Sequence, residues 1–466
     1  MPRTAAAAAP ADPAPAIAVI PPLPVVSAAS EQARRMLTAV TTADDENFLR
    51  FLRENYPTSK LTPAAWLELR SNLRKLQFHG FASVSGTQAE ITVFDAAREG
   101  WARFVVTVEP TPPYAITTFA MRMGRRPRDV PPPPRLQPTE LGAVANAKAQ
   151  ELARSGRFAG VVLIAKDGRP LLDAVYGTAD WAAQRPNTLQ TQFRFGSMGK
   201  MFTAVAIMQL AQAGKLDLSA PIGRYLKDYP NAEVASKVTT DMLLTHTGGT
   251  GDIFGPQFTA HRDTLHDGKD YVAFYGARPP QFTPGSQTAY SNYGFILLGR
   301  IVEEASGLSY DTYIKRYIFS PAGMTATGNQ PERLRLPRRA ISYMTRDGAL
   351  TSAASTLPYR GTAAGGGYST SDDLLRFANA LMSNRLLDAD HTRLLTTGGP
   401  AGTALHYDFS ATTSEGRRYF GHAGGAPGMS GELRIFPGNA YTVVVLANRD
   451  PPVAGVIASF ISDRLP

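Results

Sequence analysis

Ser197 and Lys200 are the residues whose types and spacing point most directly to chemistry, since they lie three positions apart in Ser-Met-Gly-Lys. On a helix this spacing puts both side chains on one face, about one turn apart. A serine hydroxyl becomes a good nucleophile when a base takes its proton, and a lysine can be that base where burial lowers its pKa. The alternative interpretation is a helix cap at Ser197 followed by a solvated lysine.

The residues around this pair favour burial of Lys200. Most of them are apolar: Phe193, Phe195, Met201, Phe202, Val205, Ala206 and Leu210. A buried lysine needs a partner or a function, because an isolated charge is costly in an apolar interior. A P-loop is excluded because Met201 follows the lysine, and a Gly-x-Ser-x-Gly elbow is excluded because position 195 is Phe195.

Two further motifs follow in order, Tyr290-Ser291-Asn292 and His422-Ala423-Gly424-Gly425. Together with the Ser197 motif they resemble the serine hydrolases of the class C β-lactamase and penicillin-binding-protein superfamily. The likeness runs from about Pro138 to Pro466, and further similar stretches are LLTHTGG, GGGYSTSDDLLRFANAL and VVVLANRD. It implies a β-lactamase/transpeptidase-like α+β domain, in which an antiparallel sheet is flanked by helices and carries a helical insert.

The resemblance implies the roles of the motif residues in acyl transfer. Ser197 would attack an ester or amide carbonyl, and Lys200 would accept the serine proton. Tyr290 would act as phenolate, proton relay or acid to the leaving group, and Asn292 would hold the substrate or Lys200.

The same resemblance assigns the oxyanion to two backbone N–H groups, those of Ser197 and Gly425. Glycines at Gly424 and Gly425 suit a strand that a substrate backbone must approach closely.

His422 departs from the β-lactamase pattern. Dedicated β-lactamases of this class carry Lys-Thr-Gly at this motif, whereas His422-Ala423-Gly424 lacks both the fixed cation and the hydroxyl that grip a substrate carboxylate. The His-x-Gly form resembles the peptidase and esterase branches. His422 could instead be a strand histidine whose hydrogen bonds are all local.

We therefore expect a serine acyl-hydrolase that forms an acyl-enzyme on Ser197 and acts as an esterase or peptidase on small or D-amino-acid-containing substrates. The alternatives are a β-lactamase or D,D-carboxypeptidase, and a catalytically silent binding protein. The expected partner is a small ester, amide or peptide, without nucleic acid and without a cofactor. The oligomeric state is not readable from the sequence.

The composition narrows the chemistry further. The chain of 466 residues has a net charge of +9 and no cysteine, which excludes disulfides, thiolate catalysis and Cys-ligated metal. We interpret the charge as a basic surface, because no nucleic-acid motif accompanies the arginine clusters Arg122, Arg125, Arg126, Arg128 and Arg333, Arg335, Arg338, Arg339. His261 and His266 do not share a helix face, so we expect no metal site.

The chain divides into four expected segments. Residues 1–30 are Ala- and Pro-rich and read as a disordered leader or degenerate export signal, which favours a periplasmic or secreted protein. Residues 31–126 predict a small α+β domain of cystatin or NTF2-like shape. Residues 127–137 form a Pro-rich linker, and residues 138–466 form the hydrolase domain. No apolar run has the length of a transmembrane helix.

Strands at both ends of the hydrolase domain must position the motifs. Apolar runs predict strands near residues 158–165, 170–176, 417–421, 430–436 and 441–446, and a final helix near 453–465. Because the segments between them read as helices, we expect one antiparallel sheet built from distant parts of the chain, with the helical insert against one face.

Overall fold

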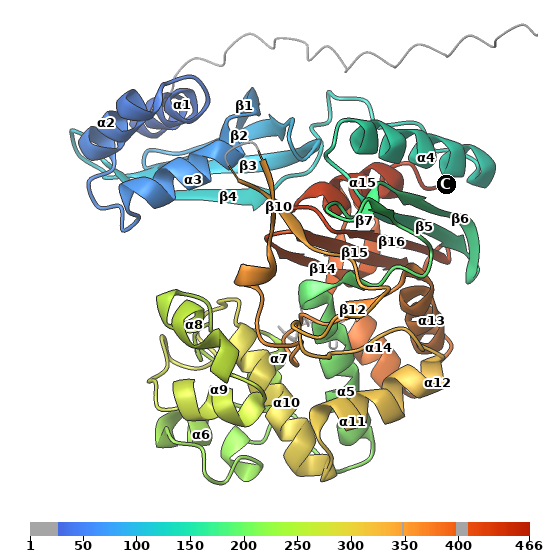
Figure 1. Cartoon of the computed structure of the whole chain (residues 1–466). Coiled ribbons are helices and arrows are strands. Elements are labelled where there is room, and N and C mark those ends of the chain that lie inside the picture. Colours follow the sequence, from blue (N-terminus) through green and yellow to red (C-terminus); the bar gives the residue numbers. More distant parts are fainter. Residues whose placement is uncertain (1–26, 347–348, 398–408) are drawn as a thin grey trace, which may run out of the picture. The chain divides into compact units, whose positions relative to one another are not determined.

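The computed structural model describes residues 27–346, 349–397 and 409–466, without the side chain of Met123. The chain forms two compact units, one that ends at Pro131 and one from Pro132 to Pro466 (Figure 1). The first 26 residues of the expected leader lie outside the described residues.

The N-terminal unit places three helices before a four-stranded antiparallel sheet in the order β1-β2-β3-β4. Its elements are α1 (Ala28–Thr41), α2 (Asp45–Asn55), α3 (Pro63–Leu73), β1 (Leu76–Val84), β2 (Gln88–Asp95), β3 (Gly100–Val108) and β4 (Ile116–Met123). Ser27, Asp44 and Thr62 cap the three helices with their side-chain oxygens. The small α+β domain expected before the hydrolase domain is therefore present.

The C-terminal unit is built on a six-stranded antiparallel sheet in the order β13-β14-β15-β16-β5-β6. The strands are β5 (Gly160–Lys166), β6 (Arg169–Tyr176), β13 (Ser410–Thr412), β14 (Arg418–Ala426), β15 (Met429–Phe436) and β16 (Tyr441–Ala447). β5 pairs with β16 from Gly160 opposite Ala447 to Lys166 opposite Tyr441. This confirms the expectation that strands from both ends of the domain form one sheet.

Both faces of the sheet are covered, because successive side chains of a strand point to opposite sides. On β16, Val443 and Val445 pack with α4 (Pro138–Arg154) and α15 (Val453–Ser462). Val444 and Leu446 belong instead to the large core shared with the helical insert. Figure 1 shows α4 and α15 on one side of the strands and the insert on the other.

The helical insert is organised around α5 (Lys200–Gln212), which is apolar on nearly every side and almost entirely buried. The helices of the insert are η1 (Gly196–Gly199), η2 (Ile222–Arg224), α6 (Ala232–Lys237), α7 (Thr240–Leu244), α8 (Pro256–His261), η3 (Arg262–Thr264), α9 (Gly268–Tyr275), α10 (Asn292–Ser306), α11 (Tyr310–Ile314), η4 (Lys315–Phe319), α12 (Ser320–Ala322), η5 (Ala354–Thr356), α13 (Ser371–Met382) and α14 (Ala389–Thr397). Among the described helices, none combines the length and apolar composition that a bilayer crossing requires.

Short strands that the sequence analysis does not predict lie between these helices. They are β7 (Thr178–Asp180), β8 (Arg185–Pro186), β9 (Phe193–Arg194), β10 (Tyr343–Arg346), β11 (Ala349–Ser352) and β12 (Tyr368–Ser369). The pairing of β9 with β12 matters for the site, because β9 leads directly into the turn that carries Ser197.

Candidate active site

Ser197 lies on the tight turn η1, between β9 and α5. Gly196 adopts φ +55°, a conformation that favours glycine. The turn packs directly on β14, since a Cβ added to Gly424 would lie 1.8 Å from the carbonyl oxygen of Phe195. Backbone-to-backbone packing, made possible by glycine, therefore holds the Ser197 turn against the strand that carries the third motif.

Lys200 is fully buried, with 0% of its surface exposed. Its Nζ donates to Asn292 Oδ1 at 2.7 Å and to the Ala364 carbonyl at 2.6 Å, and it lies 3.2 Å from Ser197 Oγ. The aromatic rings of Tyr290 and Phe295 have centroids 4.7 and 5.4 Å from the same nitrogen. These oxygens and ring faces replace the water that a buried amine loses.

Asn292 is the first residue of α10, and Ser291 caps that helix by accepting from the Gly294 N–H at 2.8 Å. The Asn292 side chain reaches Lys200 with its oxygen and Asp252 with its nitrogen, which donates to Asp252 Oδ2 at 3.2 Å. The start of α10 thus joins the lysine to a carboxylate on a separate loop.

Tyr290 precedes this helix and has 45% of its surface exposed, so one side of its ring meets solvent. The ring packs against His246 at a centroid distance of 4.5 Å. His246 accepts the Ser291 N–H at Nδ1 over 3.1 Å, so this ring nitrogen carries no proton while the bond holds. His246 therefore holds the Tyr290 segment through one hydrogen bond to the Ser291 backbone and one ring contact with Tyr290.

The residues of β14 that follow Phe420 lie beyond the segment paired with β13 and form the edge of the strand at the site. Within the described residues, β13 pairs with Arg418 to Phe420, and the Gly421 N–H then donates to the Phe409 carbonyl at 2.7 Å. Alternation along a strand turns the N–H groups of Ala423 and Gly425 to the same side as that of Gly421, away from β15. The Gly425 N–H therefore faces the edge that a substrate would approach.

His422 lies on the same strand and is half-buried, with its ring 5.6 Å from that of Phe409. Its side chain shares a face with Phe420, which belongs to the core on the insert side of the sheet. The Nδ1–H of His422 donates to the Ala423 carbonyl. A carbonyl only accepts, so this bond fixes the proton on Nδ1.

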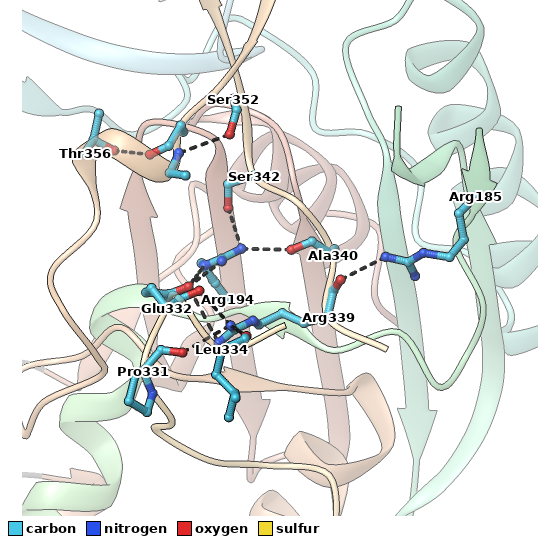
Figure 2. A network of polar contacts seen from close by, with 12 residues as sticks. Arg185, Arg194, Pro331, Glu332, Leu334, Arg339, Ala340, Ser342, Ser352 and Thr356 are labelled. Carbon is cyan, nitrogen blue, oxygen red and sulfur yellow. Dashed lines mark hydrogen bonds and ion pairs between the residues drawn. The ribbon is translucent and has the colours of Figure 1, made fainter. Parts of the chain in front are cut away.

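A second polar network holds β9, the strand that leads to Ser197 (Figure 2). Arg194 of β9 donates from Nε to Glu332 at 3.0 Å and from Nη1 to the Ala340 carbonyl at 2.8 Å. Arg339 lies 3.6 Å from the same carboxylate and donates to the backbone carbonyls of residues 331 and 332. Burial lowers the pKa of Arg339, against the opposing effect of Glu332.

This network corrects one interpretation of the arginine clusters. Arg333, Arg335 and Arg338 are exposed as a basic surface requires, but Arg339 has 5% of its surface exposed and is a structural group. Its carboxylate partner and three backbone oxygens of the loop make that burial possible.

Sequence reasoning missed two members of the site. The Ala364 carbonyl is a backbone group without a residue signature, although the glycines at 365–367 mark an unusual backbone there. Asp252 follows the LLTHTGG stretch, but nothing in the sequence connects its carboxylate with Asn292. Within the described residues there is no cluster of potential metal ligands.

The fold and the assembled motifs define the class of the molecule, a serine hydrolase with a β-lactamase/transpeptidase-like fold. A family model described as Beta-lactamase matches residues 145–463. The chain belongs to the beta-lactamase family.

Individual relatives span several named activities. The chain is 30% identical over 307 residues to a putative penicillin-binding protein, PbpX, of Bacillus subtilis, covering 65% of this chain and 73% of that protein. It is 30% identical over 283 residues to esterase EstB of Burkholderia gladioli, covering 53% and 72%. The solved penicillin-binding protein of Bacillus halodurans matches with a TM-score of 0.59 and 29% identity, over 67% of this chain and 99% of that one.

Proposed function

We propose that the protein hydrolyses small esters, amides or short peptides, including D-amino-acid-containing ones, through an acyl-enzyme on Ser197. The observation that carries this proposal is the fully buried Lys200, whose Nζ lies 3.2 Å from Ser197 Oγ. A lysine without solvent, next to a serine hydroxyl, is a candidate general base.

The acceptors around Lys200 orient it for this role. Asn292 Oδ1 and the Ala364 carbonyl only accept, so they engage two N–H bonds of Nζ. Besides its bond to the lysine side chain, Nζ has three bonding directions, and the one that remains points to Ser197 Oγ. In the neutral amine a lone pair lies there and can take the hydroxyl proton.

The chemical step then follows. As the proton passes to Lys200, Ser197 Oγ bonds to the substrate carbonyl carbon, and the C=O electron pair moves onto the oxygen. Collapse of this tetrahedral species expels the alcohol or amine, which leaves with a proton supplied by Lys200 or Tyr290. A water molecule repeats the attack on the acyl-enzyme and releases the acid and Ser197.

We assign the oxyanion to the N–H groups of Ser197 and Gly425. The turn that carries Ser197 lies close to β14, since a Cβ added to Gly196 would lie 3.1 Å from the Gly425 nitrogen, and this short distance supports the assignment. The orientation of the Gly425 N–H away from β15 also supports this assignment.

His422 favours ester and peptide substrates over β-lactams, because an imidazole stands at the strand where dedicated β-lactamases carry the fixed cation of a lysine. The similarity to PbpX keeps penicillin recognition as the second candidate. A silent binding protein is the least supported, because Ser197 Oγ and the Nζ of the fully buried Lys200 lie within hydrogen-bond distance. We further propose a linker at 127–137, a hydrolase domain at 138–466 and a periplasmic or secreted location. The small domain expected at 31–126 begins earlier than residue 31, because α1 starts at Ala28 and Ala29 is buried in the core of that domain.

Covalent labelling tests this function. Wild type and Ser197→Ala are exposed to a fluorophosphonate and to a fluorescent penicillin, with the exposed Ser219→Ala as matched control. We expect fluorophosphonate to label wild type and Ser219→Ala and to leave Ser197→Ala unlabelled. Equal labelling of all three proteins would refute Ser197 as nucleophile. Strong labelling by penicillin would favour the second candidate.

A further inference from the structure

The segment that carries Asn292 is tied to the loop of residues 246–252 by an unusually complete set of hydrogen bonds. The Ser291 N–H donates to His246 Nδ1 at 3.1 Å, and Ser291 Oγ donates to the Gly251 carbonyl at 2.5 Å. Asp252 uses both carboxylate oxygens on Asn292: Oδ1 accepts the backbone N–H at 3.0 Å and Oδ2 accepts the side-chain Nδ2 at 3.2 Å. Only the last of these bonds touches the amide that contacts Lys200.

The carboxylate of Asp252 determines which way this amide points. An ionised carboxylate has no hydrogen, so the end of the Asn292 amide that faces it must be the NH2 group. The carbonyl oxygen is then directed to Lys200 Nζ, where it lies at 2.7 Å. The reversed amide would put oxygen against carboxylate oxygen and NH2 against the lysine nitrogen.

The direction of the amide bears on the base itself. A reversed Asn292 would donate an N–H to Lys200 and would need the lone pair of Nζ as acceptor. That is the lone pair that must take the proton of Ser197. With the carbonyl facing Lys200, the amide instead engages an N–H and leaves the lone-pair direction to the serine.

We propose that Asp252 is a positioning residue for catalysis: it locks the Asn292 amide so that the lone pair of Lys200 serves Ser197. This inference rests on the function proposed above. Asp252 acts through Asn292, and no contact of Asp252 with the reacting atoms is required.

The loop around Asp252 is itself firmly held. Arg278 donates from Nη1 to the Asp252 carbonyl at 2.8 Å and from Nη2 to the Thr250 carbonyl at 3.4 Å. Its guanidinium lies 4.3 Å from the ring centroid of Tyr275, a residue of α9. The Ile253 N–H adds a bond of 2.8 Å to Asp252 Oδ1. These bonds hold the backbone around Asp252 and keep its carboxylate in one orientation. A residue that positions another group must itself be held in this way.

The decisive test is a double-mutant cycle on acylation by an activated nitrophenyl ester. Asp252→Asn is nearly isosteric but can present an amide nitrogen where the carboxylate only accepts, so the Asn292 amide is released from its fixed direction. We expect kcat to fall about 10- to 100-fold, with KM changed far less, because misplacing a catalytic group by about 1 Å can cost on the order of 100-fold in rate. Asp263→Asn removes one charge from an exposed site of the insert and should leave kcat unchanged.

The cycle separates positioning from general structure. In the Asn292→Ala background, Asp252→Asn should have no further effect, because the group it positions is gone. Additive losses in kcat would overturn the inference, and so would wild-type kcat in Asp252→Asn. The same cycle is run with Asp252→Ser, so that a folding failure of one variant does not decide the outcome. Failure of the proposed function is recognised separately, as full activity in Ser197→Ala.

Discussion

The candidate site has two sides, and they are built by different means. On the Lys200 side, the Asn292 side chain and the Ala364 carbonyl hold a fully buried amine, and further hydrogen bonds to Asp252 and His246 hold the start of α10. On the β14 side, backbone lies against backbone through Gly424, and the side chain of His422 on the same strand is half-buried. The first arrangement leaves little freedom for Lys200 and Asn292, whereas the second leaves the half-buried side chain at position 422 open to replacement.

This difference explains how one fold can serve several activities. Relatives named as a putative penicillin-binding protein and as an esterase are both 30% identical to this chain. A reaction centre fixed by buried contacts can be kept while the exposed strand changes its side chains. The three predictions below test the two sides separately, beginning with the largest expected effect.

The Lys200 side should be intolerant of any change to the amine. Lys200→Met keeps the length and apolar stem of the side chain but removes the base, so the acylation rate should fall about 10²- to 10⁴-fold. Stopped-flow acylation by a nitrophenyl ester measures this loss, with circular dichroism to verify folding. An acylation rate close to that of wild type would show that another group takes the Ser197 proton.

The backbone contact on the β14 side should be sensitive to a single methyl group. Gly424→Ala places a Cβ 1.8 Å from the Phe195 oxygen, so the strand and the Ser197 turn must separate. We expect the free energy of unfolding to fall by about 1–3 kcal/mol, as in other overpacked interiors, together with kcat.

Urea denaturation of the Gly424→Ala variant checks the stability change. Gly438→Ala is the matched control, because a Cβ there meets no atom within 4 Å and the residue lies in the turn after β15. Equal stability of both variants would mean that the strand does not press on the Ser197 turn.

The side chain at His422 should affect which substrate is acylated and leave the chemistry nearly unchanged. His422→Lys places a permanent cation at a half-buried position. An exposed ion pair between this cation and a substrate carboxylate contributes up to about 1 kcal/mol. Acylation by penicillin should therefore rise by a few-fold, while acylation by a neutral ester stays within about twofold. His261→Lys makes the same charge change on an exposed helix and should alter neither rate. An equal rise in penicillin acylation in His422→Lys and His261→Lys would show that the effect comes from the overall charge of the protein.

Much of this architecture could be predicted from sequence, for identifiable reasons. The apolar flanks of Lys200 predicted its burial, which the structure confirms. The runs near β5 and β16 are long and apolar enough to read as strands, and the expectation that strands from both ends of the domain share one sheet followed from the helices between them.

What could not be predicted depends on contacts between loops. Asp252 is an ordinary loop residue until folding brings it to Asn292, and Arg339 looks like its exposed neighbours until its loop closes on Glu332. The Ala364 carbonyl is a backbone group, so its contact with Lys200 leaves no mark in the residue types. Two-residue strands such as β9 and β12 also carry too little pattern to be recognised.

The pairing of β5 with β16 has a consequence for synthesis of the protein. β5 ends at Lys166, but its partner strand β16 begins only at Tyr441. The helix α15, which packs on one face of these two strands, extends to Ser462. The centre of the sheet therefore cannot close during translation until nearly the whole unit has left the ribosome. Contacts between such distant segments slow folding and expose apolar surface meanwhile. We expect chains that terminate before α15 to be recovered as aggregates.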